Sequence, residues 1–274
     1  MKAVLRRIGP SGVLGGFLAT VLIVFAVLGP WLAPYDPVAL DLRARLGAPS
    51  AAHLLGADEF GRDILSRLIF GARVSITVAT TTVALAMVIG VALGLTAGYL
   101  RGWTDRVIMI LNDSALAFPG LLLALGIMAV VGASTTAMVI ALGIAFAPAV
   151  VRVTRSSVLS LREREFVEAS RVMGNAERTT MIRHVLPNCV GPLTVLATAM
   201  FGWVILAESA LSFLGLGVPP PAPSWGNMLA AARPYIQEAP WLIILPGLCI
   251  SAALLGANLL GDALRDLLDP RMQS

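Results

Sequence analysis

The chain alternates between long uncharged apolar stretches and shorter charged segments. Asp, Glu, Lys and Arg do not occur in residues 8–35, 74–100, 114–151, 185–207 and 239–261. An α-helix needs about 20 apolar residues to cross the ~30 Å hydrocarbon core of a bilayer. The longest stretch is too long for one helix and is broken near "VGASTT", so it holds most of one helix and all of another. The pattern therefore predicts six membrane spans.

In lipid, every backbone N–H and C=O must be bonded within the protein, which favours helices at this length and apolarity. We therefore predict an all-α membrane protein with six transmembrane helices. The expected spans are residues 11–33, 75–99, 107–131, 136–154, 188–209 and 241–261.

Composition agrees with this class, because only 13% of the 274 residues are charged and 57% are hydrophobic. Soluble domains have roughly 25% charged residues. The first residues, "MKAVLRRIGPSGVLGG", have the basic start of a secretory signal. The apolar run that follows is too long and ends in "GPWLAPYDP" without an A-x-A site, so we expect an uncleaved signal anchor.

The basic residues favour one orientation in the membrane. Lys and Arg accumulate on the cytoplasmic side. With a cytoplasmic N-terminus, 14 of the 20 basic residues lie within or beside the inner segments 1–10, 100–106, 155–187 and 262–274. We expect a multi-pass protein of the bacterial plasma membrane with both termini in the cytoplasm. The same bias explains the net charge of +4, so no nucleic-acid partner is expected.

The segment 34–73 would lie outside the cell, although it carries five arginines. It also carries five acidic residues, so it is electrically balanced. The stretch "EFGRDILSRLIFGARVSI" places Ile64 and Leu68 on one side of a possible helix and Arg67 elsewhere. We expect an amphipathic helix within 53–73, either in the outer interface or packed on the bundle. The expected division is 1–73 for the anchor and outer segment, and 74–274 for the transmembrane core.

Several kinds of enzyme site are excluded by residue counts. Lys2 is the only lysine, so the G-x-x-x-x-G-K-[ST] loop that binds nucleotide phosphates cannot be present. His53 and His184 are the only histidines and build no recognised metal motif with the two cysteines. Neither G-x-S-x-G nor H-E-x-x-H occurs. The sequence predicts no catalytic or metal site and no cofactor bound by this chain.

Few polar residues with a possible role in gating fall within or near the spans: Asn112, Asp113, Glu208 and Asp262. Ionisable residues are expensive in lipid, so these should face the bundle interior, a partner or water. We expect Asp113 to form a structural pair with an arginine such as Arg106, or to act in gating. Glu208 is expected at the outer end of span 5 and Asp262 at the inner end of span 6, both shallow enough for hydration.

The charged segment between spans 4 and 5 has helical periodicity. After Arg155, apolar residues recur at helical spacing, and Ser156 or Ser157 is a suitable N-cap. Gly174 predicts a left-handed stop, and Asn175 a cap for a second short helix. That helix should end before Pro187, because the residue preceding proline avoids the helical region. Leftover apolar residues rimmed by charge favour docking of a cytoplasmic partner over a loop packed on its own bundle.

The same segment resembles a known motif. Glu168, Ala169, Ser170, Gly174 and Leu186-Pro187 match the E-A-A-x-x-x-G-x(11)-L-P loop of bacterial ABC-importer permease subunits. Ser170 replaces the second alanine of the motif. His184 stands where many of these permeases carry isoleucine, and "RHVLPN" looks like the peptide-permease branch.

Three further segments extend the resemblance over most of the chain. They are "HLLGADEFGRDILSRLIFGARVSI", "ESALSFLGLGVPPPAPSWGNML" and "NLLGDALRDLLDPR". All look like the C-type permease subunit of dipeptide, oligopeptide and nickel importers. The resemblance implies the type I ABC-importer permease fold, with a cytoplasmic coupling-helix loop between spans 4 and 5.

The resemblance also implies partners and a division of labour. A substrate-binding protein outside the cell would deliver a di- or oligopeptide, or a related solute such as a nickel chelate. This chain and a homologous B-type permease subunit would form the path as a heterodimer in membrane lipid. Two cytoplasmic ABC ATPase subunits would bind ATP and Mg and supply the motion, which agrees with the missing phosphate-binding lysine.

Roles for the motif residues follow from the resemblance. Gly174 would set the bend, Glu168 would bond to a donor on the ATPase, and Ala169 and Ser170 would allow close approach. The basic side chains would pair with acidic groups on the ATPase or be merely solvated. The expected coupling residues are Glu168, Ala169, Ser170, Arg171, Gly174, Asn175, Arg178, His184, Leu186 and Pro187.

Two other classes of membrane protein agree less well with the sequence. A stand-alone secondary transporter predicts inverted repeats and coupling-ion carboxylates near mid-membrane. No convincing repeat is visible, and the three acidic residues lie toward span ends. A membrane-embedded enzyme would need a nucleophile or metal constellation, and the sequence offers none.

Overall fold

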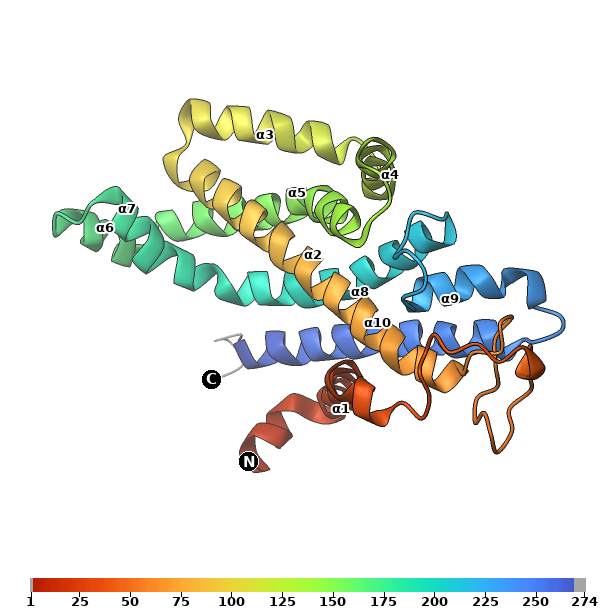
Figure 1. Cartoon of the computed structure of the whole chain (residues 1–274). Helices are drawn as coiled ribbons and strands as arrows, with labels where there is room; N and C mark the ends of the chain where they lie inside the picture. The colour runs from red at the N-terminus through yellow and green to blue at the C-terminus, as the bar shows by residue number, and fades with distance from the viewer. Residues whose placement is uncertain (1, 269–274) are drawn as a thin grey trace.

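The computed structural model describes the backbone of residues 2–268 and the side chains of residues 9–267. Long helices run side by side, and short helices lie at the two ends of the bundle (Figure 1). The helices are α1 (Lys2–Leu32), α2 (Ile64–Leu100), α3 (Gly102–Leu116), α4 (Gly120–Val131), α5 (Thr135–Arg162), α6 (Glu165–Val172), α7 (Glu177–Thr180), α8 (Val190–Phe213), α9 (Trp225–Ala232) and α10 (Trp241–Leu268). Short 3-10 turns lie at Leu42–Ala44, Leu186–Cys189 and Arg233–Tyr235.

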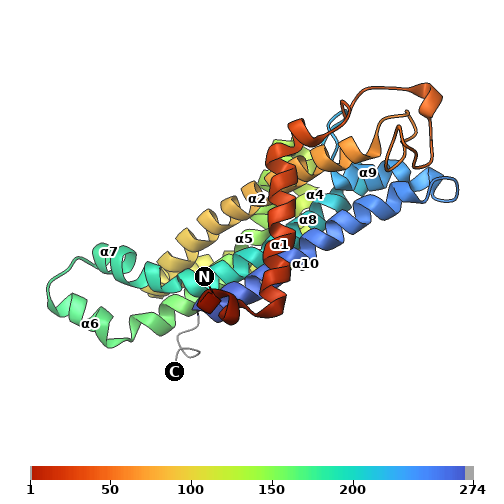
Figure 2. The same cartoon turned by 90° about the horizontal axis from the view of Figure 1, so that it is seen from below.

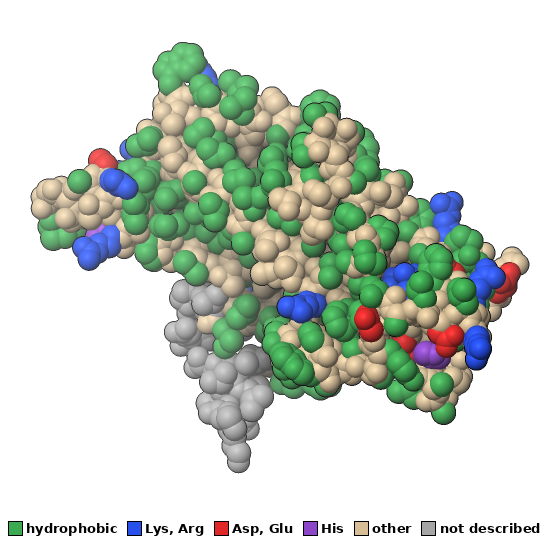
Figure 3. Space-filling model, viewed as in Figure 1, with side chains coloured by type: hydrophobic (Ala, Val, Ile, Leu, Met, Phe, Trp, Pro, Cys, Tyr) green, Lys and Arg blue, Asp and Glu red, His purple; other side chains and the backbone are tan. Residues whose placement is uncertain are grey.

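The bundle has an apolar middle and charged ends. Charged side chains gather mainly at the two ends of the molecule, and apolar side chains cover much of the surface between them (Figure 3). Within the described residues, five helices are long and apolar enough to cross a membrane, or up to six if a bent pair counts as one span. The prediction of an all-helical, multi-span membrane protein is confirmed.

The predicted span 107–131 is not one continuous helix. α3 and α4 meet at a bend of 90°. The break follows from Pro119, which has no N–H and holds Phe118, the residue before it, away from the helical region. Pro119 itself is extended (φ −55°, ψ 125°) and starts α4. Residues 102–131 therefore form a sharply bent helix pair, and α4 is seen nearly end-on beside α3 in Figure 1.

The tightest helix pair is α2 with α5. Three glycines of α2, at positions 90, 94 and 98, form a stripe along one face. A Cβ at Gly94 would lie 2.6 Å from Thr154 Cβ and 2.6 Å from the backbone oxygen of Val151. Small residues allow membrane helices to approach this closely and to gain van der Waals contact. The stripe therefore fixes α2 against α5, the helix that leads into the charged loop.

α1 packs on the outside of the bundle. It packs mainly against α10 and, less extensively, against α2. Its chain crosses α10 obliquely (Figure 2). α1 begins and α10 ends toward the end of the bundle that carries α6 and α7 (Figure 1). Residue 1 and residues 269–274, which include Arg271 and the C-terminus, lie outside the described residues.

Only residues 64–73 of the segment expected to hold an amphipathic helix, 53–73, are helical, and they pack on the bundle. Residues 53–63 form turns, and α2 begins at Ile64 and continues without a break through the second span. The start is set by Asp63, whose carboxylate accepts the backbone N–H of Ser66. The helix has 37 residues, more than a bilayer requires, so its first turns pack on the bundle beyond the apolar band. A division of the chain at residue 73 stays a prediction.

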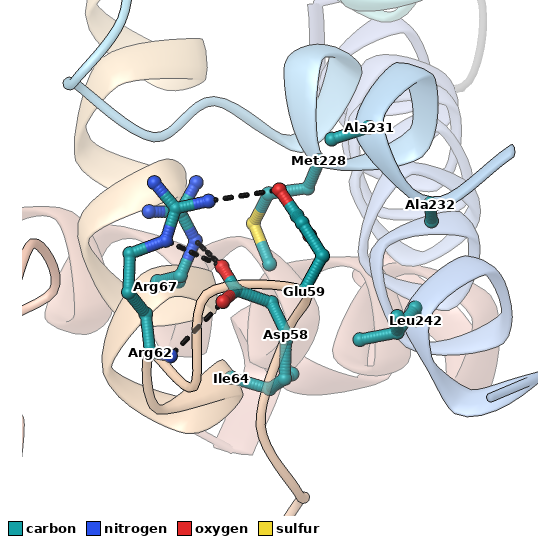
Figure 4. Close-up of a pocket in the computed structure, with 9 residues that line it drawn as sticks. All are labelled: Asp58, Glu59, Arg62, Ile64, Arg67, Met228, Ala231, Ala232 and Leu242. Carbon is teal, nitrogen blue, oxygen red and sulfur yellow. Dashed lines mark hydrogen bonds and ion pairs between the residues drawn. The ribbon is translucent and has the colours of Figure 1, made fainter. Parts of the chain in front are cut away.

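Ion pairs hold the outer segment on the bundle. Asp58 accepts from Arg62 Nε at 2.6 Å and lies 3.3 Å from Arg67 Nε, while Glu59 pairs with Arg62 at 3.1 Å. Figure 4 shows these carboxylates turned toward the two guanidinium groups, beside Met228 of α9. Burial raises the pKa of the Glu59 carboxyl above its ordinary value. Four of the charged residues that balance one another in this segment therefore form a cluster of ion pairs.

Candidate functional site

The loop between α5 and α8 projects from one end of the bundle. α5 runs to Arg162, so Ser156 and Ser157 lie inside this helix and cap nothing. The cap of α5 is Ser134, which accepts the N–H of Ala137. α6 and α7 follow as a helical hairpin beyond the ends of the other helices (Figures 1 and 2). The predicted order of helix, glycine turn and short helix is confirmed, with the first helix starting later than expected.

Gly174 ends α6 in the left-handed region (φ 81°). The Asn175 N–H donates to Ser170 O at 3.2 Å, and the Gly174 N–H donates to Arg171 O at 2.9 Å. These two bonds form a Schellman motif, which satisfies the last carbonyls of a helix and requires a positive φ. A side chain at position 174 would meet no atom within 4 Å, so only its backbone angle calls for glycine.

Ser170 is bonded inside the hairpin. Its side chain is buried, and its Oγ lies 2.9 Å from Thr180 Oγ1 and accepts from Asn175 Nδ2 at 3.1 Å. The expectation that Ser170 allows close approach of a partner is therefore wrong, because it faces α7. Asn175 does not cap α7 either, since its side chain reaches back to Ser170 and the N-cap residue is Ala176. The hydroxyl that departs from the family motif joins α6 to α7.

Tyr99 connects the hairpin to α2. Its hydroxyl donates to the carboxylate of Glu177, and Arg171 Nε lies 3.4 Å from the other oxygen of that carboxylate. The Arg171 guanidinium also stacks over the Tyr99 ring, 5.5 Å from its centroid. Arg171 is thus paired within its own chain. Tyr99 and Glu177 were not predicted from the sequence, since nothing in their local pattern indicates contact over 78 residues.

The hairpin continues directly into the fifth span. The short helix was expected to end before Pro187, but residues 181–189 stay helical and lead into α8. Met181–Val185 form a wider π turn, in which the Leu186 N–H donates to Met181 O. This widening accommodates a proline that has no N–H and would clash with the preceding turn of an α-helix. His184 and Leu186 are half-buried along this connection.

The outer surface of the hairpin combines apolar and charged side chains. Val172 and Met173 are 83% and 73% exposed. Glu168, Ala169 and Arg178 are exposed beside them. Neither Glu168 nor Arg178 forms an ion pair with any residue that the structure describes. Exposed apolar surface rimmed by charge is typical of a docking site.

Asp113 pairs with an arginine other than the expected Arg106. Its carboxylate accepts from Arg152 Nη2 at 2.7 Å, which joins α3 to α5. Two turns closer to the end of the bundle, Asp105 accepts two bonds from Arg155 at 2.5 and 2.7 Å. Arg106 instead stacks over Trp103, 5.7 Å from the ring centroid.

The other intramembrane polar residues have different surroundings. Asn112 is buried, and its Nδ2 finds no hydrogen-bond partner among the described residues. Asp262 is exposed near the end of α10, as expected for a shallow position. Of the residues that the structure describes, no three His, Cys, Asp or Glu lie together in a way that could hold a metal ion.

Glu208 was expected to be hydrated, but it is fully buried. Its Oε1 accepts from Ser212 and Ser224, both at 2.8 Å, and its Oε2 accepts weakly from Ser75 at 3.5 Å. Ser224 is also the N-cap of α9. The carboxylate therefore lies where α2, α8 and α9 meet. The Trp225 N–H donates to Ser75 Oγ at 3.3 Å, which ties α9 to α2 beside the carboxylate. Packing of these three helices excludes the water that was expected at Glu208.

These features define the class of protein: a helical membrane protein with a charged hairpin that projects from one end of the bundle. The family model described as "Binding-protein-dependent transport system inner membrane component" matches residues 90–274. A second model, "N-terminal TM domain of oligopeptide transport permease C", matches residues 10–49. The chain belongs to the family of binding-protein-dependent inner-membrane permeases.

Curated relatives cover nearly the whole chain. The chain is 47% identical over 271 residues to the di/tripeptide transport system permease protein DppC of Pseudomonas aeruginosa (strain UCBPP-PA14), which covers 96% of this chain and 89% of the relative. It is 43% identical to the dipeptide transport system permease protein DppC of Alkalihalophilus pseudofirmus, with 96% and 86% covered. Identity to the glutathione transport system permease protein GsiD of Escherichia coli O6:K15:H31 is 42%, with 92% and 84% covered.

A solved structure has the same fold. The inward-facing MetNI methionine ABC transporter aligns with a TM-score of 0.56 at 17% sequence identity, covering 72% of this chain and 96% of that chain. The predicted permease fold is confirmed. At this identity the likeness concerns the fold alone.

Proposed function

We propose that this chain is the C-type permease subunit of an ATP-driven importer that moves di- or oligopeptides, or a related small solute, into the cytoplasm. The observation that carries the proposal is the protruding α6–α7 hairpin, which is continuous with α8 and bonded to α2 through Tyr99. A partner that moves this hairpin moves two membrane helices with it. The names of the relatives support a peptide substrate.

ATP and Mg are bound by partner ATPase subunits in this proposal. A homologous B-type permease completes the path, and a binding protein delivers substrate from outside. The exposed Glu168, Val172 and Met173 form the surface that one ATPase subunit contacts. This end of the bundle, with the start of α1 and the end of α10, faces the cytoplasm.

The proposal is tested with the full complex in proteoliposomes, by measuring ATP hydrolysis and uptake of a radiolabelled dipeptide together. Gly174→Pro removes the positive φ of the turn, and Glu168→Lys reverses a charge on the contact surface. Both variants should insert and assemble, while uptake per ATP falls strongly. Glu238→Lys, an exposed charge reversal at the other end of the bundle, is the matched control.

Unchanged uptake in both hairpin variants would contradict the coupling role. Substrate class is tested in the same vesicles by comparing uptake of Ala-Ala, a longer peptide, glutathione and a nickel chelate. Transport of none of these by the unmodified complex would overturn the proposed substrate class.

A further inference from the structure

A charged hollow lies between α3 and the inner half of α5. It has a volume of about 620 Å³, and its lining includes Trp103, Asp105, Arg106, Ile110, Asp113 and Arg155. Small-molecule sites in proteins typically measure about 300–1,000 Å³. Acidic and basic side chains face the same space, beside the apolar surfaces of Trp103 and Ile110. This mixture suits a small ligand that carries both charges.

Asp113, which lines the hollow, forms an exposed ion pair with Arg152 of α5. The side chains of Arg152 and Asp113 are 60% and 56% exposed. Arg152 lies between Val151 and Thr154, the two residues of α5 that contact Gly94 of α2. From Gly94, α2 continues for six more residues to its end at Leu100. The pair therefore lies about 9 Å inside the end of α2. Charges at such a position face water or protein and not lipid.

The two ion pairs between α3 and α5 differ in strength. Arg155 holds Asp105 with two short bonds, and both side chains are less than one-third exposed. The Arg152–Asp113 pair has one bond and is more than half exposed. Exposed ion pairs contribute little to stability because water screens them. The Arg155–Asp105 pair therefore fixes α3 against α5, while the Arg152–Asp113 pair exchanges partners easily.

We propose that the hollow is a transfer site for a peptide with free termini, in which Arg152 binds the carboxylate and Asp113 binds the ammonium as their own ion pair opens. This inference rests on the proposed function and names the surface that the peptide meets inside the membrane. Trp103 and Ile110 offer mainly apolar contact surface to the side chains of the peptide.

The test uses the complete complex in proteoliposomes, with p-benzoylphenylalanine in place of Ile110 and radiolabelled Ala-Ala as the probe. Illumination during ATP turnover should cross-link the dipeptide to this chain. Arg152→Gln should lower the yield about tenfold or more, the loss expected for one hydrogen bond to a charged group. Arg73→Gln, which changes another exposed arginine on a spanning helix, should leave the yield unchanged.

The double variant Asp113→Asn with Arg152→Gln separates charge from structure, because it keeps a hydrogen-bonding pair without charges. It should also lose the cross-link, and a yield close to the unmodified level would overturn the proposal. Cross-linking of phospholipid in place of the dipeptide would overturn it in favour of a lipid site. Absence of dipeptide uptake by the unmodified complex would overturn the proposed function itself, whereas uptake without any cross-link at position 110 would overturn the transfer site alone.

Discussion

Ser170 shows how one hydroxyl group organises the hairpin. The family motif has a small apolar residue at this position, and a hydroxyl there must find a partner because the side chain is buried. Thr180 supplies it from α7, and Asn175 donates to the same oxygen from the turn. The three side chains hold α6 and α7 together at the bend that Gly174 allows.

Ser170→Ala should therefore loosen the hairpin. It leaves the buried Thr180 hydroxyl without its partner, at a cost of about 1–3 kcal/mol of local stability. Faster hydrogen exchange of the amides in residues 174–180 would measure this. Ser170→Ala combined with Thr180→Val removes both polar groups and should recover much of the loss. Equal exchange in all three proteins would contradict the role of the bond.

Glu208 is a second buried polar centre, at the opposite end of α8. Glu208→Ala should free the start of α9, because Ser212 and Ser224 lose a shared acceptor at about 1–3 kcal/mol each. The expected result is faster proteolysis within residues 214–224 of the assembled complex. Glu208→Gln keeps one acceptor oxygen and should show less than half of this effect. A Gln variant cleaved as fast as the Ala variant would show that the charge, and not the acceptor, holds α9.

Among the helices, the contact of α2 with α5 combines close approach with a functional position. α5 leads into the hairpin, and Tyr99 near the end of α2 bonds to Glu177 of the hairpin. The glycine stripe of α2 brings α2 and α5 together in the part of the bundle next to the hairpin. If a partner moves the hairpin as proposed, the movement would reach the α2–α5 pair in addition to α8.

Gly94→Leu should separate this pair. The new side chain would meet Thr154 and the backbone of Val151 at 2.6 Å, where no rotamer gives relief. We expect a loss of at least about 1–3 kcal/mol and a lower thermal midpoint of the purified complex. Gly126→Leu on α4 is the matched control, because a Cβ there has nothing within 4 Å. Similar midpoints for the two variants would contradict a tight α2–α5 contact.

Taken as one molecule, the chain has two charged ends of different construction. One end presents the α6–α7 hairpin, and the other carries α9 and the paired cluster of Asp58 and Arg67 (Figures 1 and 4). α8 links them, since it follows the hairpin directly and ends beside Glu208 and α9. A single helix therefore connects the surface proposed to meet an ATPase with the opposite face.

The orientation of these two ends is tested by cysteine labelling of cells. In a background with Cys189 and Cys249 replaced by alanine, Asn175→Cys should react with an impermeant maleimide only after permeabilisation. Gln237→Cys, exposed near α9, should react in intact cells. Labelling of position 175 in intact cells would overturn the orientation.

The apolar and charged pattern of the sequence was enough to predict the class of fold and most spans. Membrane spans follow from composition, because lipid requires long apolar helices wherever the backbone crosses it. Gly174 was also predictable, since the turn depends on local backbone geometry. Pro119 could have indicated the bend between α3 and α4. Hydropathy alone does not show a bend, because the residues on both sides of it are apolar.

The remaining features depend on contacts between residues distant in sequence, which only the tertiary structure decided. Arg152 and Asp113 are 39 residues apart, and Ser224 meets Glu208 over 16 residues. Such pairs form because helix packing brings their faces together, and no local pattern records which faces will meet. Burial has the same origin: Glu208 was a shallow carboxylate in the sequence, and it lies out of water because α9 folds back over the end of α8.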